Sequence, residues 1–111
     1  MASKLENYLR TYRRRAGLSQ GEIALLLGTA SGTRVARYER FNREPGLHTA
    51  LAFEIIFHAP AEDLFAGLYD RIEREVRHRA ELVVRKLEAG KQDRLTQHKL
   101  AALRAIMNRP S

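Results

Sequence analysis

The chain has 111 residues and a formal net charge of +7, from 20 Lys and Arg against 13 Asp and Glu, which favours a polyanionic partner. It contains no cysteine, which excludes a disulfide framework and a thiolate metal site and suits a reducing cytoplasm. No run of residues approaches the roughly 20 apolar positions that span a bilayer, and residues 1–15 lack the apolar core of a secretory signal, so we expect a cytoplasmic protein.

The first predicted helix covers residues 3–16. Ser3 and Glu6 have the spacing of a capping box, in which serine and glutamate side chains satisfy free backbone donors at a helix start. Apolar residues then recur at helical spacing, and Gly17 is suited to end the helix. These apolar residues are Leu5, Leu9, Tyr12 and Ala16.

A second capping box, made by Ser19 and Glu22, opens a predicted helix over residues 20–27. Gly28 follows directly and is expected to end this helix. One face of the helix is apolar, with Ile23, Ala24, Leu26 and Leu27.

A third helix is predicted over residues 32–40, with Ser31 as its N-cap. Only Val35 and Tyr38 are large and apolar in it, so the helix has a narrow buried stripe and a wide polar face. Three residues of that face carry hydroxyl or guanidinium groups: Thr33, Arg34 and Arg37. Arginine can bridge O6 and N7 of guanine, and threonine can contact a base edge or a thymine methyl group. The pattern is typical of a recognition helix in the major groove of DNA.

Residues 41–46 break the helical periodicity and end in Pro-Gly, which predicts a loop. A fourth helix is predicted to begin at Leu47, and residues 58–60 interrupt it. Its apolar residues are Leu47, Ala50, Leu51, Ile55, Ile56 and Phe57.

Apolar residues then recur at intervals of three and four as far as Gly90. They are Leu64, Leu68, Ile72, Val76, Ala80, Val83 and Leu87. One helix with this stripe would be about 40 Å long at a rise of 1.5 Å per residue, longer than a 60-residue domain is broad, so part of it must project or pair. We expect Gly67 to divide it into a short fifth helix and a longer sixth one.

Thr96 is the predicted cap of a last helix, whose apolar residues are Leu100, Leu103, Ile106 and Met107. The preceding stripe is predicted to form a dimer interface, because exposed apolar stripes of that length usually mark one. The predicted interface residues are Leu68, Ile72, Val76, Val83 and Leu87. The alternative is that the last helix folds back over the stripe and covers it within one chain.

The first 65 or so residues resemble the XRE-like helix-turn-helix family, which includes phage repressors and Cro. The resemblance rests on five blocks in the family's order: RRRAGLSQGEIALLLG, SGTRVARYE, the R-x-P of residues 43–45, LHTALAFEIIF and AEDLF. It implies an all-α fold, with a five-helix repressor-like DNA-binding domain over residues 1–66. Residues 67–111 would then form a C-terminal extension, with a long helix followed by a short terminal one.

Two positions depart from the family's pattern. The turn of residues 28–30 is one residue longer than usual before Ser31. Phe41 stands where the family usually has glycine at the end of the third helix, so we expect Asn42 to take the left-handed conformation.

The resemblance also implies phosphate contacts. Gln20, at the start of the second helix, matches a glutamine that grips the DNA backbone, where free backbone donors can also hold a phosphate. The loop after the third helix is placed against the DNA backbone as well. The further predicted phosphate contacts are Ser31, Arg40, Asn42 and Arg43.

A structural ion pair between Arg13 and Glu39 is implied in the same way, and it would join the first helix to the end of the third. For the other arginines of the first helix, phosphate contact and a solvated helix surface both stay open. These residues are Arg10, Arg14 and Arg15.

Nothing in the sequence indicates catalysis. The histidines are too far apart for a local metal clip, at His48, His58, His78 and His98. There is no nucleophile elbow and no glycine-rich phosphate loop. We therefore expect no enzyme, no metal, no cofactor and no small-molecule ligand.

The leading hypothesis is a sequence-specific regulator that binds double-stranded DNA as a homodimer, with a recognition helix over residues 31–40. A second hypothesis is a protein-interaction adaptor or antitoxin-like subunit that uses the C-terminal helices and keeps the helix-turn-helix as a scaffold. Nonspecific nucleic-acid binding through the basic charge is a third. The exposed face of the third helix discriminates among them, because base contact requires Thr33 and Arg37 to point outward.

Overall fold

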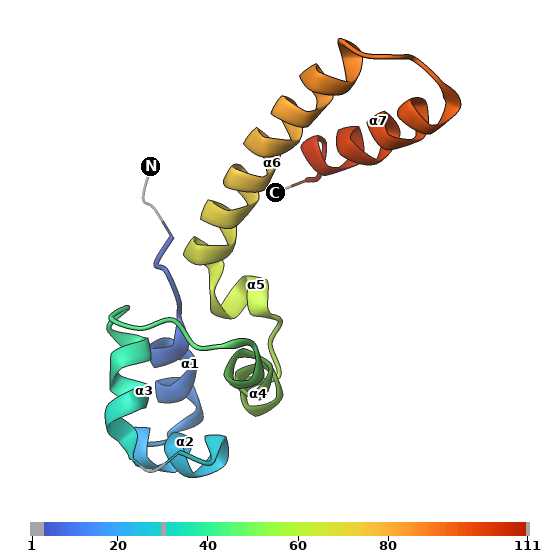
Figure 1. Cartoon of the computed structure of the whole chain (residues 1–111). Coiled ribbons are helices and arrows are strands. Elements are labelled where there is room, and N and C mark those ends of the chain that lie inside the picture. The colour runs from blue at the N-terminus through green and yellow to red at the C-terminus, as the bar shows by residue number, and fades with distance from the viewer. Residues whose placement is uncertain (1–3, 30, 111) are drawn as a thin grey trace. The chain divides into compact units, whose positions relative to one another are not determined.

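The computed structural model describes residues 4–29 and 31–110. Within these ranges the regular structure is all α-helical, as predicted (Figure 1). The helices are α1 (Leu9–Ala16), α2 (Gln20–Leu27), α3 (Gly32–Glu39), α4 (Leu47–Phe57), α5 (Ala61–Leu64), α6 (Ala66–Glu88) and α7 (Arg94–Met107). The chain divides into two compact units, one ending at Tyr69 and the other beginning at Asp70. No helix in the described ranges has the length and apolarity to cross a membrane.

The predicted capping box of α2 is confirmed. The Ser19 hydroxyl accepts a hydrogen bond of 3.0 Å from the Glu22 amide, and the Glu22 carboxylate accepts one of 2.8 Å from the Ser19 amide. The bond from the Ser19 amide holds the pKa of Glu22 below its ordinary value. Gly28 ends the helix in the left-handed conformation, with φ of 76°.

The predicted start of the first helix is wrong: α1 begins at Leu9 rather than at residue 3. Ser3, the predicted cap, lies outside the described residues. Asn7 takes over part of the capping role, since its side-chain oxygen accepts a hydrogen bond of 3.1 Å from the Leu9 amide. Its side-chain nitrogen donates to the Tyr38 carbonyl at 2.9 Å, so the start of α1 is tied to α3.

The segment before α1 caps another helix. The carbonyl oxygens of Leu5 and Glu6 accept hydrogen bonds from the amides of Gly67 and Leu68, at 2.8 and 3.2 Å. These amides lie in the first turn of α6, where backbone donors have no partner within the helix. A short N-terminal segment thus satisfies donors that would otherwise need water.

Gly67 does not divide the fifth and sixth helices, as we had expected. The break comes at Phe65, which follows α5 with φ of −119° and ψ of 43°. Gly67 lies inside α6, where a Cβ atom would overlap the Leu5 carbonyl group and lie 2.9 Å from the Cα atom of Glu6. The glycine therefore permits a close approach of two backbones rather than a helix break.

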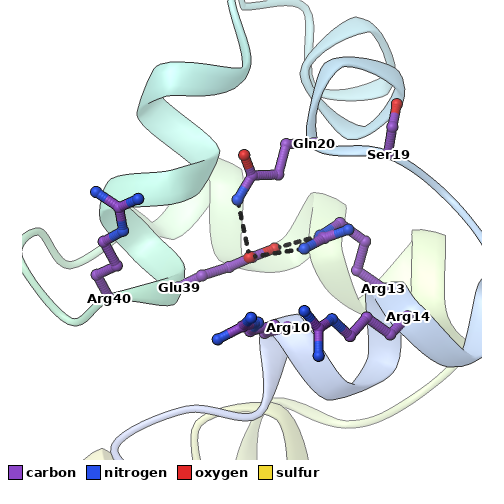
Figure 2. A pocket seen from close by; sticks show the side chains of 7 residues that line it. All are labelled: Arg10, Arg13, Arg14, Ser19, Gln20, Glu39 and Arg40. Atoms are coloured by element: carbon purple, nitrogen blue, oxygen red, sulfur yellow. Dashed lines mark hydrogen bonds and ion pairs between the residues drawn. The ribbon is translucent and has the colours of Figure 1, made fainter.

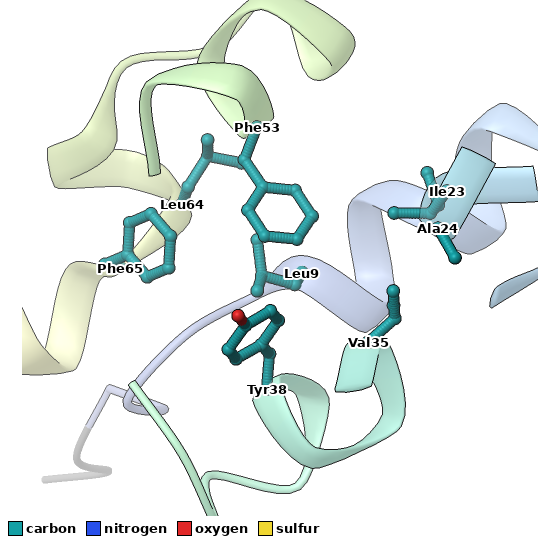
Figure 3. Close-up of a cluster of buried hydrophobic side chains, with 8 residues drawn as sticks. All are labelled: Leu9, Ile23, Ala24, Val35, Tyr38, Phe53, Leu64 and Phe65. Atoms are coloured by element: carbon teal, nitrogen blue, oxygen red, sulfur yellow. The ribbon is translucent and has the colours of Figure 1, made fainter. Parts of the chain in front are cut away.

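The core of the first unit is built by α1 to α5 and the residue after α5 (Figure 3). Its buried side chains are Leu9, Ile23, Ala24, Val35, Tyr38, Phe53, Leu64 and Phe65. The ring centroid of Phe53 lies 6.2 Å from that of Tyr38 and 6.4 Å from that of Phe65, both edge-on. Each fully buried Leu, Ile, Val or Phe side chain contributes about 1.5 to 3 kcal/mol to folding. The core therefore fixes α3 against α1 and α4.

The end of α3 corrects a second prediction. Phe41, not Asn42, takes the left-handed conformation, with φ of 65°. The amide of Asn42 donates to the Arg37 carbonyl at 3.0 Å, and that of Phe41 donates to the Tyr38 carbonyl at 3.1 Å. These are the two bonds of a Schellman motif, which places the left-handed residue two positions after the last helical one. Since α3 ends at Glu39, that position is Phe41.

Within the second unit, α7 turns back along α6 (Figure 1). Ala80 of α6 and Leu100 of α7 are buried there. Arg104 of α7 lies 3.6 Å from Glu88 of α6, and the Arg77 guanidinium of α6 donates to the carbonyl of Arg109, which follows α7. The last helix therefore folds back against α6, as in the alternative arrangement raised by the sequence.

The fold-back of α7 covers only part of the apolar stripe. Ile72, Val76 and Val83 stay 48%, 41% and 44% exposed, and Leu87 is half-buried. Leu68 was expected in the dimer interface, but it packs against the core of the first unit because it lies in the first turn of α6. The exposed part of the stripe is therefore shorter than predicted.

Asp93, not Thr96, is the N-cap of α7. Its carboxylate accepts a hydrogen bond of 2.8 Å from the Thr96 amide, which lowers the pKa of Asp93. Thr96 occupies the third position of the helix, and its amide is one of the free donors that a cap must satisfy.

Candidate nucleic-acid interface

Two buried residues hold α3 against the core, as the sequence predicts. Val35 and Tyr38 are 1% and 3% exposed, and Glu39 at the helix end is also buried. The opposite face is open to solvent, and it carries Thr33, Arg34 and Arg37. Among the described residues, the side chains of Arg34 and Arg37 make no hydrogen bond or ion pair. Two cationic side chains and one hydroxyl are thus available to a partner on this face.

The start of α3 lies tightly against the start of α2. A Cβ atom on Gly32 would lie 3.2 Å from the carbonyl carbon of Gln20 and from the amide nitrogen of Gly21. Glycine therefore allows the two helix starts to approach each other. Gln20 therefore lies directly beside the start of α3.

Ser31 is the N-cap of α3 by its backbone, but its side chain makes no capping hydrogen bond. It lines a hollow of about 300 Å³ together with Gly28, Thr29 and Arg34. The turn that was predicted to be longer than usual includes Ala30, which lies outside the described residues. The described part of the turn thus places Ser31 and Arg34 around one hollow at the beginning of α3.

Arg13 and Glu39 form the ion pair that the resemblance implies (Figure 2). The Nε and Nη2 atoms of Arg13 lie 2.6 and 3.1 Å from the two carboxylate oxygens of Glu39. This hydrogen bonding raises the pKa of Arg13 above its ordinary value, so the guanidinium group stays charged. Arg13 also donates to the Leu18 carbonyl at 3.0 Å. The pair therefore joins α1 both to α3 and to the turn before α2.

Gln20 joins the same network. Its side-chain nitrogen donates to the carboxylate of Glu39 at 3.1 Å, so the residue expected to hold a DNA phosphate is engaged within the protein. The Gln20 side chain is half-buried at the beginning of α2. Glu39 thereby accepts hydrogen bonds from both Arg13 and Gln20, and one carboxylate connects three helices.

A hollow of about 390 Å³ surrounds this network. It is lined by Arg10, Arg13, Arg14, Ser19, Gln20, Glu39 and Arg40. The sequence left the roles of Arg10 and Arg14 open, although their spacing of four residues already places them on one face of α1. Sequence reasoning missed that this face turns toward Gln20 and Arg40, because their meeting depends on how α1, α2 and α3 pack.

The loop after α3 exposes its polar side chains. Arg40, Asn42 and Arg43 are all open to solvent. Arg40 lines the hollow beside Gln20, whereas Asn42 and Arg43 do not belong to it. The structure thus brings together two of the predicted phosphate contacts, Gln20 and Arg40.

No group of three His, Cys, Asp or Glu residues in the described part of the chain could hold a metal ion. His48 lies in α4, His78 in α6 and His98 in α7.

Comparison with known protein families, curated proteins and solved structures finds no match to this chain.

Proposed function

We propose that α2 and α3 form a helix-turn-helix and that the chain is a sequence-specific regulator of double-stranded DNA, acting in the cytoplasm. The observation that carries this proposal is the division of α3 into two faces. Val35 and Tyr38 are buried, while Arg34 and Arg37 are exposed and unpaired in the described structure. A helix in the major groove needs such a face, because base edges are recognised by hydrogen-bonding side chains that no internal partner occupies.

In this proposal the first unit is a five-helix repressor-like domain of the XRE-like family. Thr33, Arg34 and Arg37 contact bases. Phosphate contacts come from the surrounding residues Gln20, Ser31, Arg40, Asn42 and Arg43. No catalytic group takes part, because the interface acts by hydrogen bonding and charge alone.

We further propose that the protein binds DNA as a homodimer through the exposed stripe of α6. Ile72, Val76 and Val83 remain at least two-fifths exposed after α7 has folded back. A two-fold pair would place two recognition helices about 34 Å apart, or one turn of B-DNA. The preferred site would then be an inverted repeat with half-site centres about 10 base pairs apart, or a multiple of that distance.

The same exposed stripe favours the second candidate function, that of a protein-interaction subunit. Exposed apolar surface on a helix is suited to binding another protein. In that case the polar face of α3 would have no role in binding, and the chain would show no sequence preference on DNA. Nonspecific binding through the net charge would likewise give affinity without preference.

Selection of bound duplexes from a random DNA pool tests the proposal. We expect the unmodified chain to enrich one motif with inverted symmetry, and a Thr33→Ala/Arg37→Ala variant to lose that enrichment. Arg74→Ala/Arg85→Ala is the control, because both arginines are exposed on α6 and lie on the helix face opposite the exposed apolar stripe. Recovery of random sequences by the unmodified chain would contradict sequence-specific binding.

A further inference from the structure

The hollow around Glu39 holds more positive charge than its one carboxylate can balance. It is lined by four arginines and one glutamate, and Arg13 already pairs with that glutamate. Three guanidinium groups remain, those of Arg10, Arg14 and Arg40. None of the three has a hydrogen bond or ion pair among the described residues. Like charges gathered in one hollow repel one another unless an anion enters.

The three free arginines are held by well-fixed parts of the fold. Arg10 and Arg14 lie four residues apart on α1 and flank Arg13, whose guanidinium group is fixed by Glu39 and the Leu18 carbonyl. Arg40 follows Glu39 directly, so the same ion pair positions its backbone. Figure 2 shows Arg10 and Arg14 extending from α1, and Arg40 from the end of α3, with Glu39 between them in this view. The three arginines therefore border one hollow, and the ion pair of Arg13 and Glu39 fixes the helices that carry them.

The chemistry of the lining suits a phosphate group. Guanidinium groups donate paired hydrogen bonds to phosphate oxygens and keep their charge at any physiological pH. The hollow also includes Ser19 and Gln20, at the start of α2, where first-turn amides have no partner within the helix. A volume of about 390 Å³ lies in the range of ligand sites in proteins. A phosphate with an attached sugar is therefore a suitable occupant.

We propose that Arg10, Arg14 and Arg40 form, with Gln20, a clamp for one phosphate of the DNA backbone. This inference rests on the proposed function and extends it, because it assigns Arg10 and Arg14 a role in binding rather than on a solvated helix surface. The clamp lies beside the start of α2 and the end of α3, so it holds the DNA backbone next to the helix that contacts the bases. The clamp fixes the position of α3 along the DNA duplex, but it does not contribute to sequence preference.

The test compares two double variants of the full chain. Arg10→Gln/Arg14→Gln removes two clamp arginines, and Arg74→Gln/Arg85→Gln removes the same charge from the α6 face opposite the exposed apolar stripe. Binding of a fluorescent 20-base-pair duplex is measured by anisotropy between about 50 and 200 mM salt. We expect the clamp variant to bind about tenfold more weakly and its log-log salt slope to flatten by roughly one unit. The α6 variant should differ from the unmodified chain by less than about twofold.

Folding is checked by circular dichroism, and neither arginine side chain of the clamp variant has a hydrogen bond or ion pair to lose among the described residues. Two clearly different failures can be separated. If both double variants bind the duplex equally well, the clamp is wrong while DNA binding stands. If the unmodified chain does not bind any duplex, the proposed function is wrong.

A second probe, inorganic pyrophosphate, separates a DNA phosphate from a free one. In the unmodified chain, NMR signals of the Arg10 and Arg14 Nε–H groups should shift on titration with pyrophosphate, and DNA should displace it. Shifts without any DNA binding would support a phosphate site for a free ligand. Absence of shifts together with equal DNA affinity of the two variants would overturn the clamp altogether.

Discussion

The two carboxylate oxygens of Glu39 accept hydrogen bonds from two nitrogen atoms of Arg13, at 2.6 and 3.1 Å. Only 14% of the Arg13 side chain and 3% of the Glu39 side chain are exposed. Removing one partner leaves a buried charge without compensation, which costs about 3 to 5 kcal/mol. We therefore expect Arg13→Met to lower the free energy of unfolding by about that amount in urea denaturation followed by circular dichroism.

The matched control removes both charges. Arg13→Met/Glu39→Leu leaves no uncompensated charge, so it should recover much of the stability lost in Arg13→Met. If the double variant were as unstable as the sum of the two single variants, the two side chains would not be coupled. Because Arg13→Met is expected to destabilise the fold, a loss of DNA binding by this variant would not show that Arg13 contacts DNA.

Gly67→Ala should destabilise the first unit. The added Cβ atom would overlap the Leu5 carbonyl and crowd the Cα atom of Glu6, both backbone groups that cannot rotate away. Overpacking of this kind costs about 1 to 3 kcal/mol, which a thermal melt would detect as a lower Tm. Gly90→Ala is the control, since its Cβ atom would have no neighbour closer than 3.7 Å. Equal melting temperatures for the two variants would contradict the close backbone contact.

The cap of α7 should respond to pH. Because the Thr96 amide lowers the pKa of Asp93 below its ordinary value of 3.8, the carboxylate contributes stability that is fully present above that value. This stability is lost as the pH falls through the lowered pKa. We expect amide protection at the beginning of α7, measured by NMR, to decrease in that acid range. Asp93→Asn should retain a cap without this pH dependence, and identical acid behaviour of both proteins would exclude the role of Asp93.

The exposed stripe of α6 predicts self-association. Analytical ultracentrifugation at about 50 μM, well above the range of weak association, should find a dimer of the unmodified chain. Ile72→Asp/Val76→Asp should be monomeric, because two apolar contacts would become buried charges. Leu25→Asp is the control, since Leu25 is the most exposed large apolar residue of α2, at 80%. A monomeric unmodified chain would contradict a dimer interface on α6.

The sequence predicted most of the elements whose signals are local. The capping box of Ser19 and Glu22 places the start of α2, and the two buried residues of α3 follow from the spacing of Val35 and Tyr38. Such features depend on neighbours within four positions, so a single sequence contains the required information. The all-α class is predictable for the same reason.

Features that depend on tertiary contacts were missed. Gly67 has the pattern of a helix break, but its role comes from the backbone of Leu5, more than sixty positions away in the sequence. The start of α1 depends on Asn7, whose side chain bonds to Tyr38 of another helix. The hollow around Glu39 forms only when α1, α2 and α3 pack, so the spacing of Arg10 and Arg14 predicts a shared face but not its neighbours.

The affinity of Arg37→Ala for two duplexes tests the central claim most directly. One duplex carries the motif selected by the unmodified chain, and the other carries its scrambled sequence. We expect the variant to lose about 1 to 3 kcal/mol on the selected duplex and to bind the scrambled duplex nearly as before, because Arg37 is exposed on the face that would contact bases. Equal affinities of Arg37→Ala and the unmodified chain for the selected duplex, with unchanged helical content, would contradict base contact by α3.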